Sequence, residues 1–158
     1  MTAAQLREEI EDELSQIELT VRELRGLRED VADKEPTIRE KTAAAAFLAQ
    51  FYNGVENILK RISYLNSIPL PTGDTWHVTL FKHFCNPPHS ALPVLFDESL
   101  VLPMSGFRKF RHVVHHGYGF QLDWDRLKEG MDMVGAVAYK FETVVRNYLN
   151  ELENRSVL

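Results

Sequence analysis

The residue types that could do chemistry are concentrated in one stretch, residues 107–119. It holds two arginines, one lysine and three of the chain's six histidines, and two glycines lie near its end. Within it, Arg111, His116 and Tyr118 are spaced R-x4-H-x-Y. Histidine can take or give a proton near neutral pH, and arginine offers a planar fork of charged N–H groups to phosphate oxygens. Tyrosine can hydrogen-bond a phosphate or stack on a base. Together these residue types suit metal-free cleavage of RNA.

Helical spacing alone does not aim the three side chains at one point. Arg111 and Tyr118 are seven residues apart and share one side of a helix, whereas His116 lies about 140° around the axis from Arg111. Gly117 and Gly119 can adopt the left-handed conformation that ends a helix. A helix that unwinds there could turn His116 and Tyr118 inward, so we expect the site at a helix end.

The pattern R-x4-H-x-Y resembles the signature of HEPN-domain ribonucleases, specifically the HepT-like toxins of HEPN/MNT toxin–antitoxin pairs. The phrase Phe-Arg-His-Val-Val-x-His-x-Tyr, followed by Phe-x-Leu-Asp, is similar to HepT-like proteins in more than these three positions. Phe-Tyr-Asn-Gly-Val-Glu56 also looks like the second helix of HEPN domains, where a glutamate lies beside the site. A solvated helix residue is the alternative for Glu56. The resemblance implies three catalytic residues and several supporting or RNA-binding ones: Arg111, His116 and Tyr118, with Arg108, Lys109, His112 and Glu56.

The same resemblance implies a function and partners. It implies an endoribonuclease toxin that needs no metal or other cofactor and acts on RNA, with tRNA as the family's substrate. It implies a homodimer, or a higher even oligomer, whose composite site combines two signatures and so supplies both a base and an acid. It also implies an MNT-type nucleotidyltransferase antitoxin that silences the toxin by AMPylation, the transfer of AMP to Tyr118.

Two positions leave the assignment of roles open. Many HEPN signatures have Asn directly after the arginine, where this chain has His112. That histidine could bind RNA, orient Arg111 or face solvent. His115 is one helical turn from Arg111, which suits a structural pair. We choose His116 as the catalytic histidine because its spacing to Tyr118 matches the family.

The rest of the chain predicts the helices that position the signature. Apolar residues at steps of three and four indicate three long amphipathic helices. The first covers 3–30, the second runs from the capping residue Thr37 to about residue 66, and the third begins at Asp123 or Asp125. A short helix is expected over 76–84 and the signature helix over about 104–116, while 92–102 is ambiguous between a short helix and an extended segment. We therefore expect an all-α fold: one HEPN (HepT-like) domain over 1–158, an antiparallel bundle of four long helices with one or two short extra helices.

Composition narrows the class of protein. A chain of 158 residues with 44% hydrophobic content can bury the core of one domain. No apolar run approaches the ~20 residues of a membrane span, and the single Cys85 cannot form a disulfide within the chain, so we expect a cytoplasmic protein. The net charge is −5, yet residues 41–122 hold seven bases and four acids. This distribution suits local binding of a phosphate rather than long non-specific contact with nucleic acid.

Two other classes of function remain open. His112, His115 and His116 form an i, i+3, i+4 group that could bind zinc, although no carboxylate lies at helical spacing among them. The chain could also be a non-catalytic helix-bundle partner of a nucleotidyltransferase. The scattered histidines at 77, 83 and 89 show no metal-ligand spacing and are expected to be surface or hydrogen-bonded residues.

Overall fold

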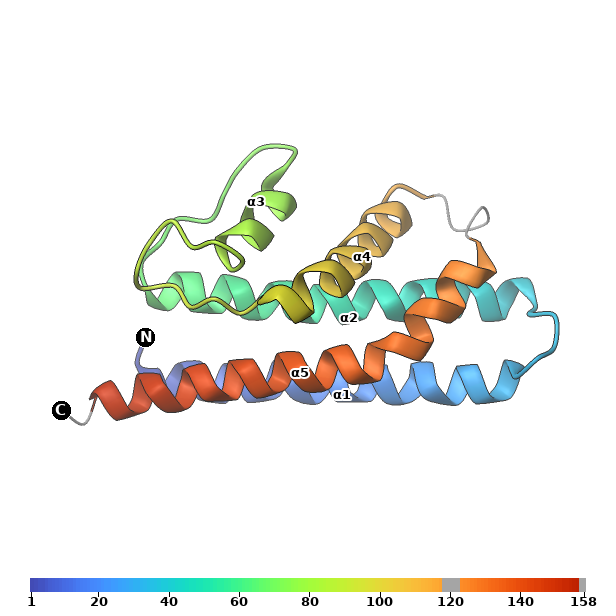
Figure 1. Cartoon of the computed structure of the whole chain (residues 1–158), viewed down its shortest axis with the longest axis horizontal. Coiled ribbons are helices and arrows are strands. Elements are labelled where there is room, and N and C mark those ends of the chain that lie inside the picture. The colour runs from blue at the N-terminus through green and yellow to red at the C-terminus, as the bar shows by residue number, and fades with distance from the viewer. Residues whose placement is uncertain (118–122, 157–158) are drawn as a thin grey trace.

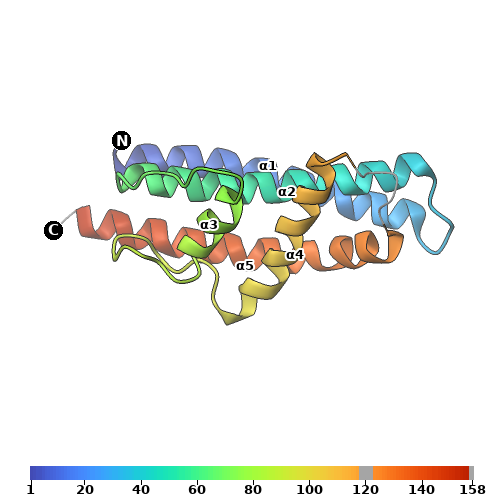
Figure 2. The ribbon, with the colours of Figure 1, turned by 90° about the horizontal axis from the view of Figure 1, so that it is seen from above.

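The structure is a computed structural model that describes residues 1–117 and 123–156. Its helices are α1 (Ala3–Val31), α2 (Ile38–Leu65), α3 (Trp76–His83), α4 (Glu98–His115) and α5 (Trp124–Ser156). The described residues contain no strand, so the predicted all-α class and helix bundle are confirmed. Long helices α1, α2 and α5 lie side by side, with α1 antiparallel to both neighbours, and α4 crosses α2 and α5 obliquely (Figures 1 and 2).

The helix starts follow from local chemistry. The hydroxyl of Thr2 accepts from the Gln5 amide, and the Gln5 side chain accepts from the Thr2 amide; Thr37 and Glu40 repeat this exchange at the start of α2. Each capping box satisfies two backbone donors that the first turn leaves unpaired. At α5, the carboxylate of Asp123 accepts from the amide of Asp125, so the earlier of the two predicted caps begins the helix.

The apolar stripes form one core. The stripe of α1 packs against α2 and α5, and α4 packs against α2 and α5. Fully burying a Leu, Ile or Phe side chain stabilises the fold by about 1.5–3 kcal/mol relative to exposure. The largest buried side chains come from every long helix and the segment before α4, including Leu6, Ile10, Phe51, Tyr52, Phe96 and Phe141.

Helix α4 begins six residues earlier than the sequence predicts. The apolar pattern predicts a start near Met104, directly after Pro103. In the structure Asp97 is the N-cap, and its carboxylate accepts from the amides of Ser99 and Leu100. Pro103 is inside the helix. Leu100, Met104 and Phe107 are buried at steps of four and three, so core packing extends the helix through the proline.

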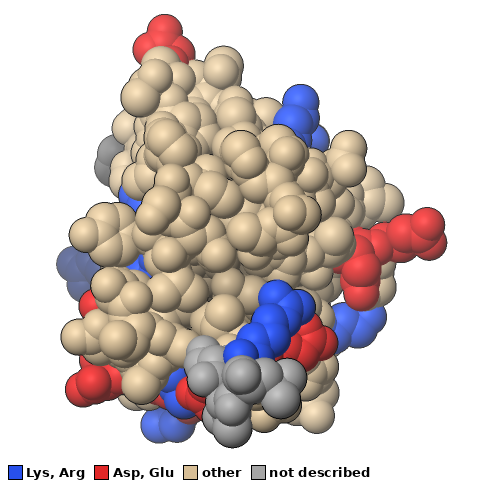
Figure 3. All heavy atoms as spheres, turned by 90° about the vertical axis from the view of Figure 1, so that its left-hand side faces the viewer, with Lys and Arg blue, Asp and Glu red and all other residues tan. Residues whose placement is uncertain are grey.

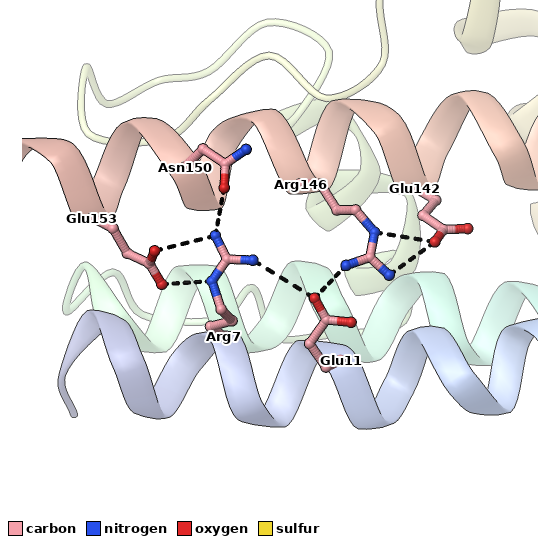
Figure 4. A network of polar contacts seen from close by, with 6 residues as sticks. All are labelled: Arg7, Glu11, Glu142, Arg146, Asn150 and Glu153. Atoms are coloured by element: carbon pink, nitrogen blue, oxygen red, sulfur yellow. Dashed lines mark hydrogen bonds and ion pairs between the residues drawn. The ribbon is translucent and has the colours of Figure 1, made fainter.

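Ion pairs join α1 to α5 along the outside of the bundle (Figure 4). Arg7 pairs with Glu153, at 2.5 Å from Nε to Oε1, and donates to Asn150. Glu11 contacts Arg146, which also pairs with Glu142. These side chains are partly exposed, so each pair contributes about 0–1 kcal/mol. They pair charges of both signs across the two helices, with Arg7 of α1 on Glu153 of α5 and Glu11 of α1 on Arg146 of α5.

None of the helices in the described part of the chain is long and apolar enough to cross a membrane. Figure 3 shows the end of the molecule that holds both termini, where the visible charged side chains are scattered and of both signs. That end does not offer the clustered cations that phosphate contacts need.

A tight contact between α1 and α2 gives a prediction about stability. A Cβ atom at Gly54 would lie 2.7 Å from Cγ1 of Ile17. We expect Gly54→Ala to lower the free energy of unfolding by about 1–2 kcal/mol, because overpacking outweighs the gain in helix propensity. The matched control is Gly26→Ala in α1, where no atom lies within 4 Å; it should stabilise by about 0.5–1 kcal/mol. Urea denaturation measures both, and equal stabilisation would contradict the tight contact.

Candidate functional site

Arg111 is the centre of a polar cluster where α2, α3 and α4 meet. Its Nε–H donates to Oδ1 of Asn53 at 2.8 Å, and its Nη1 lies 3.1 Å from Nε2 of His77. Its Nη2 lies 3.6 Å from Oε1 of Glu56. The Arg111 side chain keeps 16% of its exposure. The guanidinium is therefore held in place from three directions and still borders solvent.

Glu56 is buried, so the alternative interpretation of this residue as a solvated helix residue is wrong. The residue is only 2% exposed, and its Oε2 lies 2.7 Å from Nδ1 of His77. A buried carboxylate is stable only when partners compensate for lost hydration. Here α3 supplies His77 and α4 supplies Arg111. Asn53 and Glu56 are three residues apart and share one face of α2.

The hydrogen-bond directions assign the tautomer of His77. An arginine N–H can only donate, so Nε2 of His77 must accept from Arg111. The ring proton then lies on Nδ1 and is donated to Glu56. His77 is thus a neutral imidazole held between a carboxylate and a guanidinium. The expectation that His77 is a hydrogen-bonded histidine is confirmed.

Aromatic rings and further cations surround the cluster. Nζ of Lys60 lies 4.7 Å from the ring centroid of Trp76, and the guanidinium carbon of Arg111 lies 5.9 Å from it. The guanidinium of Arg108 lies 5.6 Å from the ring centroid of Phe81. Such cation–π contacts each contribute about 0.5–2 kcal/mol. Three cations from α2 and α4 are therefore gathered around the short helix α3.

Tyr52 closes the inner side of the cluster. Burial, followed by the negative charge of Glu56, raises the pKa of its phenol well above the usual range. In the described part of the chain its hydroxyl oxygen and Nε of Arg108 are buried without a hydrogen-bond partner. Tyr52 therefore stays neutral and forms a wall of the site rather than a proton-transfer group.

The predicted catalytic histidine, His116, lies apart from Arg111. It is the exposed C-cap of α4, its Nδ1 lies 2.8 Å from the backbone oxygen of His112, and the two rings are 4.1 Å apart. Gly117 has φ +79°, so its predicted left-handed conformation is confirmed. Among the described residues no contact joins His116 to Arg111, and the inward turn expected at the glycine is not seen for His116. Tyr118 and Gly119 lie outside the described residues.

The charge of the cluster acts on His115, although no hydrogen bond or ion pair among the described residues joins the two. Partial burial, and then the positive charge of Arg111, lower the pKa of its imidazole. A lowered pKa means that His115 is neutral at pH 7.

His112 is exposed. Lys109 lies on another side of α4, where it lines a cavity of about 450 Å³ between α4 and α5 together with Arg126 and Glu129.

A metal centre is not supported by the geometry of the histidines. Within residues 1–117 and 123–156, no three histidine, cysteine, aspartate or glutamate side chains are grouped so that they could hold a metal ion. The rings of the exposed His112 and His116 lie against each other at an angle of 37°, and Nδ1 of His116 is directed to a backbone oxygen. The triple-histidine alternative therefore lacks a set of converging ligands.

The bundle and its buried arginine–carboxylate–histidine cluster define a helical protein with a polar site at a helix junction. The family model for HepT-like proteins matches residues 43–152, which is more than half of the chain and includes the whole cluster. The chain therefore belongs to the HepT-like family of HEPN toxins. Comparison with curated proteins and with solved structures gave no match.

Sequence reasoning missed two members of the cluster, Asn53 and His77. Asn53 had an available signal, because it precedes Glu56 by three residues and so lies on the same helix face. No comparable signal existed for His77, which lies on another helix, 21 residues after Glu56 and 34 before Arg111. Its position depends on how α3 folds back on α2.

The charge of Arg111 gives a prediction about His115. In an NMR titration, the pKa of His115 should lie below the usual 6.5, and Arg111→Gln should raise it by removing a positive charge. Lys109→Gln is the matched control, because it removes a cation from another side of α4 and should leave the pKa unchanged. If both variants shift the pKa equally, the general field of α4 is responsible and not contact with the cluster.

Proposed function

We propose that the chain is a metal-independent endoribonuclease toxin of a HEPN/MNT toxin–antitoxin system, acting on tRNA in the cytoplasm. One observation supports this most strongly: the guanidinium of Arg111 is held by Asn53, Glu56 and His77 at the edge of solvent. Of its five N–H groups, at least two remain for a ligand. A fixed arginine with free donors stabilises charge that develops on a phosphate.

The surroundings of Arg111 favour RNA over an isolated phosphate. Trp76 is partly exposed, and one cation from α2 and one from α4 lie near its ring. An unpaired base can stack on such a ring, while Lys60 meets a neighbouring phosphate. Single-stranded loops of a folded RNA present bases in this way, and tRNA offers several such loops. The acidic outer helices keep the contact local.

The proposed reaction is transesterification at a phosphodiester. The 2′-oxygen attacks phosphorus, Arg111 stabilises the five-coordinate phosphate, and His116 protonates the leaving 5′-oxygen. The products are a 2′,3′-cyclic phosphate and a 5′-hydroxyl. General acid–base catalysis and electrostatic stabilisation each contribute about 10²–10⁴-fold.

The position of His116 supports a composite site in a homodimer. It is exposed at the end of α4 and apart from Arg111 of its own chain. A second copy that docks its α4 end near the cluster would bring its own His116 to the phosphate held by Arg111. Each dimer would then contain two such sites.

A second candidate function is a non-catalytic partner of a nucleotidyltransferase. The observation that favours it is the cavity between α4 and α5, which includes the exposed side chains of Leu102 and Met133. A cleavage assay with the pure protein separates the two candidates.

Loss of RNA cleavage is the first test. In buffer with EDTA, Arg111→Ala and His116→Ala should each reduce cleavage of tRNA at least 10²-fold, because each removes a catalytic group. His115→Ala should matter much less. Arg39→Ala is the matched control: an exposed arginine on α2, 17 residues before Glu56 or about 25 Å along the helix. A folded His116→Ala protein with the parental rate would refute its role, and 3′-hydroxyl products would refute the mechanism.

Mixing of inactive variants tests the composite site. Arg111→Ala homodimers and His116→Ala homodimers should each be inactive, and subunit exchange should restore up to about a quarter of parental activity. The reason is that one site in a heterodimer has an intact Arg111 from one chain and an intact His116 from the other. Cleavage by the mixture measures this, with either variant alone as the control. An active protein that is strictly monomeric by light scattering would contradict the proposal.

Tyr118 is the proposed point of control. AMPylation would replace its neutral phenol with a phosphodiester bearing a negative charge, and Arg111 could pair with that charge, so RNA would be excluded. Peptide mass spectrometry after co-expression with the antitoxin should find AMP on Tyr118. Tyr139 is an internal control, because it is 73% exposed on α5 and should remain unmodified. A silenced toxin with unmodified Tyr118 would mean inhibition by binding alone.

A further inference from the structure

His77 lies beside Arg111 and is fixed in orientation from both ring nitrogens, whereas His116 lies apart from Arg111. Nδ1–H of His77 donates to Oε2 of Glu56 at 2.7 Å, and Nε2 lies 3.1 Å from Nη1 of Arg111. The His77 side chain is 21% exposed, whereas the Glu56 side chain is only 3% exposed. A buried carboxylate behind an accessible imidazole fixes the tautomer and stabilises the imidazolium that forms when the ring takes a proton.

The arrangement exceeds what a structural cluster requires. Asn53 and Glu56 already contact Arg111, and the Arg111 guanidinium could satisfy the Glu56 carboxylate without a histidine. The His77 ring adds an acceptor nitrogen that faces the guanidinium and not the core. A phosphate oxygen bound at Nη1 would lie close to Nε2, because both nitrogens are within hydrogen-bond distance of each other. A cation for phosphate and a base for its ribose are thus adjacent in one chain.

We propose that His77 is the general base of the Arg111 site and accepts the proton of the RNA 2′-hydroxyl. This inference rests on the proposed ribonuclease function and names a residue for its base. In the free protein, Arg111 occupies the lone pair of Nε2. When Arg111 turns that N–H to a substrate phosphate, Nε2 becomes available to the hydroxyl. Binding of the phosphate by Arg111 therefore frees Nε2 of His77 to act as the base.

The 2′-O–H bond breaks, its proton goes to Nε2 of His77, and the 2′-oxygen forms a bond to phosphorus. The bond from phosphorus to the 5′-oxygen breaks, and that oxygen takes a proton from His116 of the second copy. Glu56 stays ionised and pairs with the imidazolium. Both histidines return to their starting protonation states by exchange with water, so no oxidant or co-reactant is needed.

Kinetics of His77→Gln test the role. Glutamine keeps a hydrogen-bonding side chain of similar reach but cannot take a proton. We expect kcat for RNA cleavage in EDTA to fall 10²–10⁴-fold, the acidic limb of the pH–rate profile to disappear, and affinity for inorganic phosphate to stay within twofold. His89→Gln, at an exposed histidine after α3, is the matched control and should behave as the parent. A parental rate, a higher KM with unchanged kcat, or a retained acidic limb would each overturn the proposal.

A substrate with sulfur in place of the 5′-oxygen separates base from acid. A thiolate leaves without protonation, so this substrate should restore the rate of His116→Ala but not that of His77→Gln. Rescue of His77→Gln would assign it as an acid and overturn the proposal. If His77→Gln does not fold, ¹⁵N NMR of the parental protein replaces it: saturating inorganic phosphate should shift the Nε2 resonance of His77 while the Nδ1–H bond to Glu56 persists. An unmoved Nε2 resonance would overturn the proposal.

The outcomes distinguish this inference from the function on which it rests. A parental protein that cuts no RNA refutes both. A parental protein that cuts RNA, with Arg111→Ala inactive and His77→Gln fully active, refutes only the role of His77.

Discussion

The buried carboxylate of Glu56 is the constraint on which the site depends. An unpaired charge in that position would cost several kcal/mol, so the fold must bring partners to it. It obtains His77 from α3 and Arg111 from α4, and in doing so ties two helices to the middle of α2. Helix α3 has only eight residues and would not be stable alone. Its contacts with α2, including the hydrogen bond from His77 to Glu56, give His77 a defined position beside Arg111.

The sequence predicted the long helices well because their pattern reflects the same burial that stabilises them. The stripe that begins at Leu6 is buried along α1, and Thr2 and Thr37 cap as expected. The start of α4 was predicted six residues too late, and Pro103 was left outside the helix; a proline is a local signal against a helix interior. Core contacts of Leu100 and Met104 override that signal, which is a tertiary effect that no local rule contains.

The candidate site was predicted only in part, for a geometric reason. Spacing relates residues that share a helix, so Arg111 could be selected together with its neighbours on α4. His77 comes from a different helix after an irregular connection, and only the folded chain shows that it reaches Arg111. The family resemblance suggested Glu56, and the structure explains why a glutamate is useful there: one carboxylate orients both the cation and the imidazole.

The separation of His116 from Arg111 suggests how activity would be limited. One chain holds the proposed base and the phosphate-binding cation together, while the proposed acid lies exposed at the end of α4. Cleavage would then require a second copy, so a dilute monomer would bind RNA without cutting it. Tyr118, the proposed site of AMPylation, follows His116 by two residues in the sequence. In the proposed mechanism, AMP joined to Tyr118 would add a negative charge to the chain that supplies the acid, and this charge would oppose binding of the RNA phosphate.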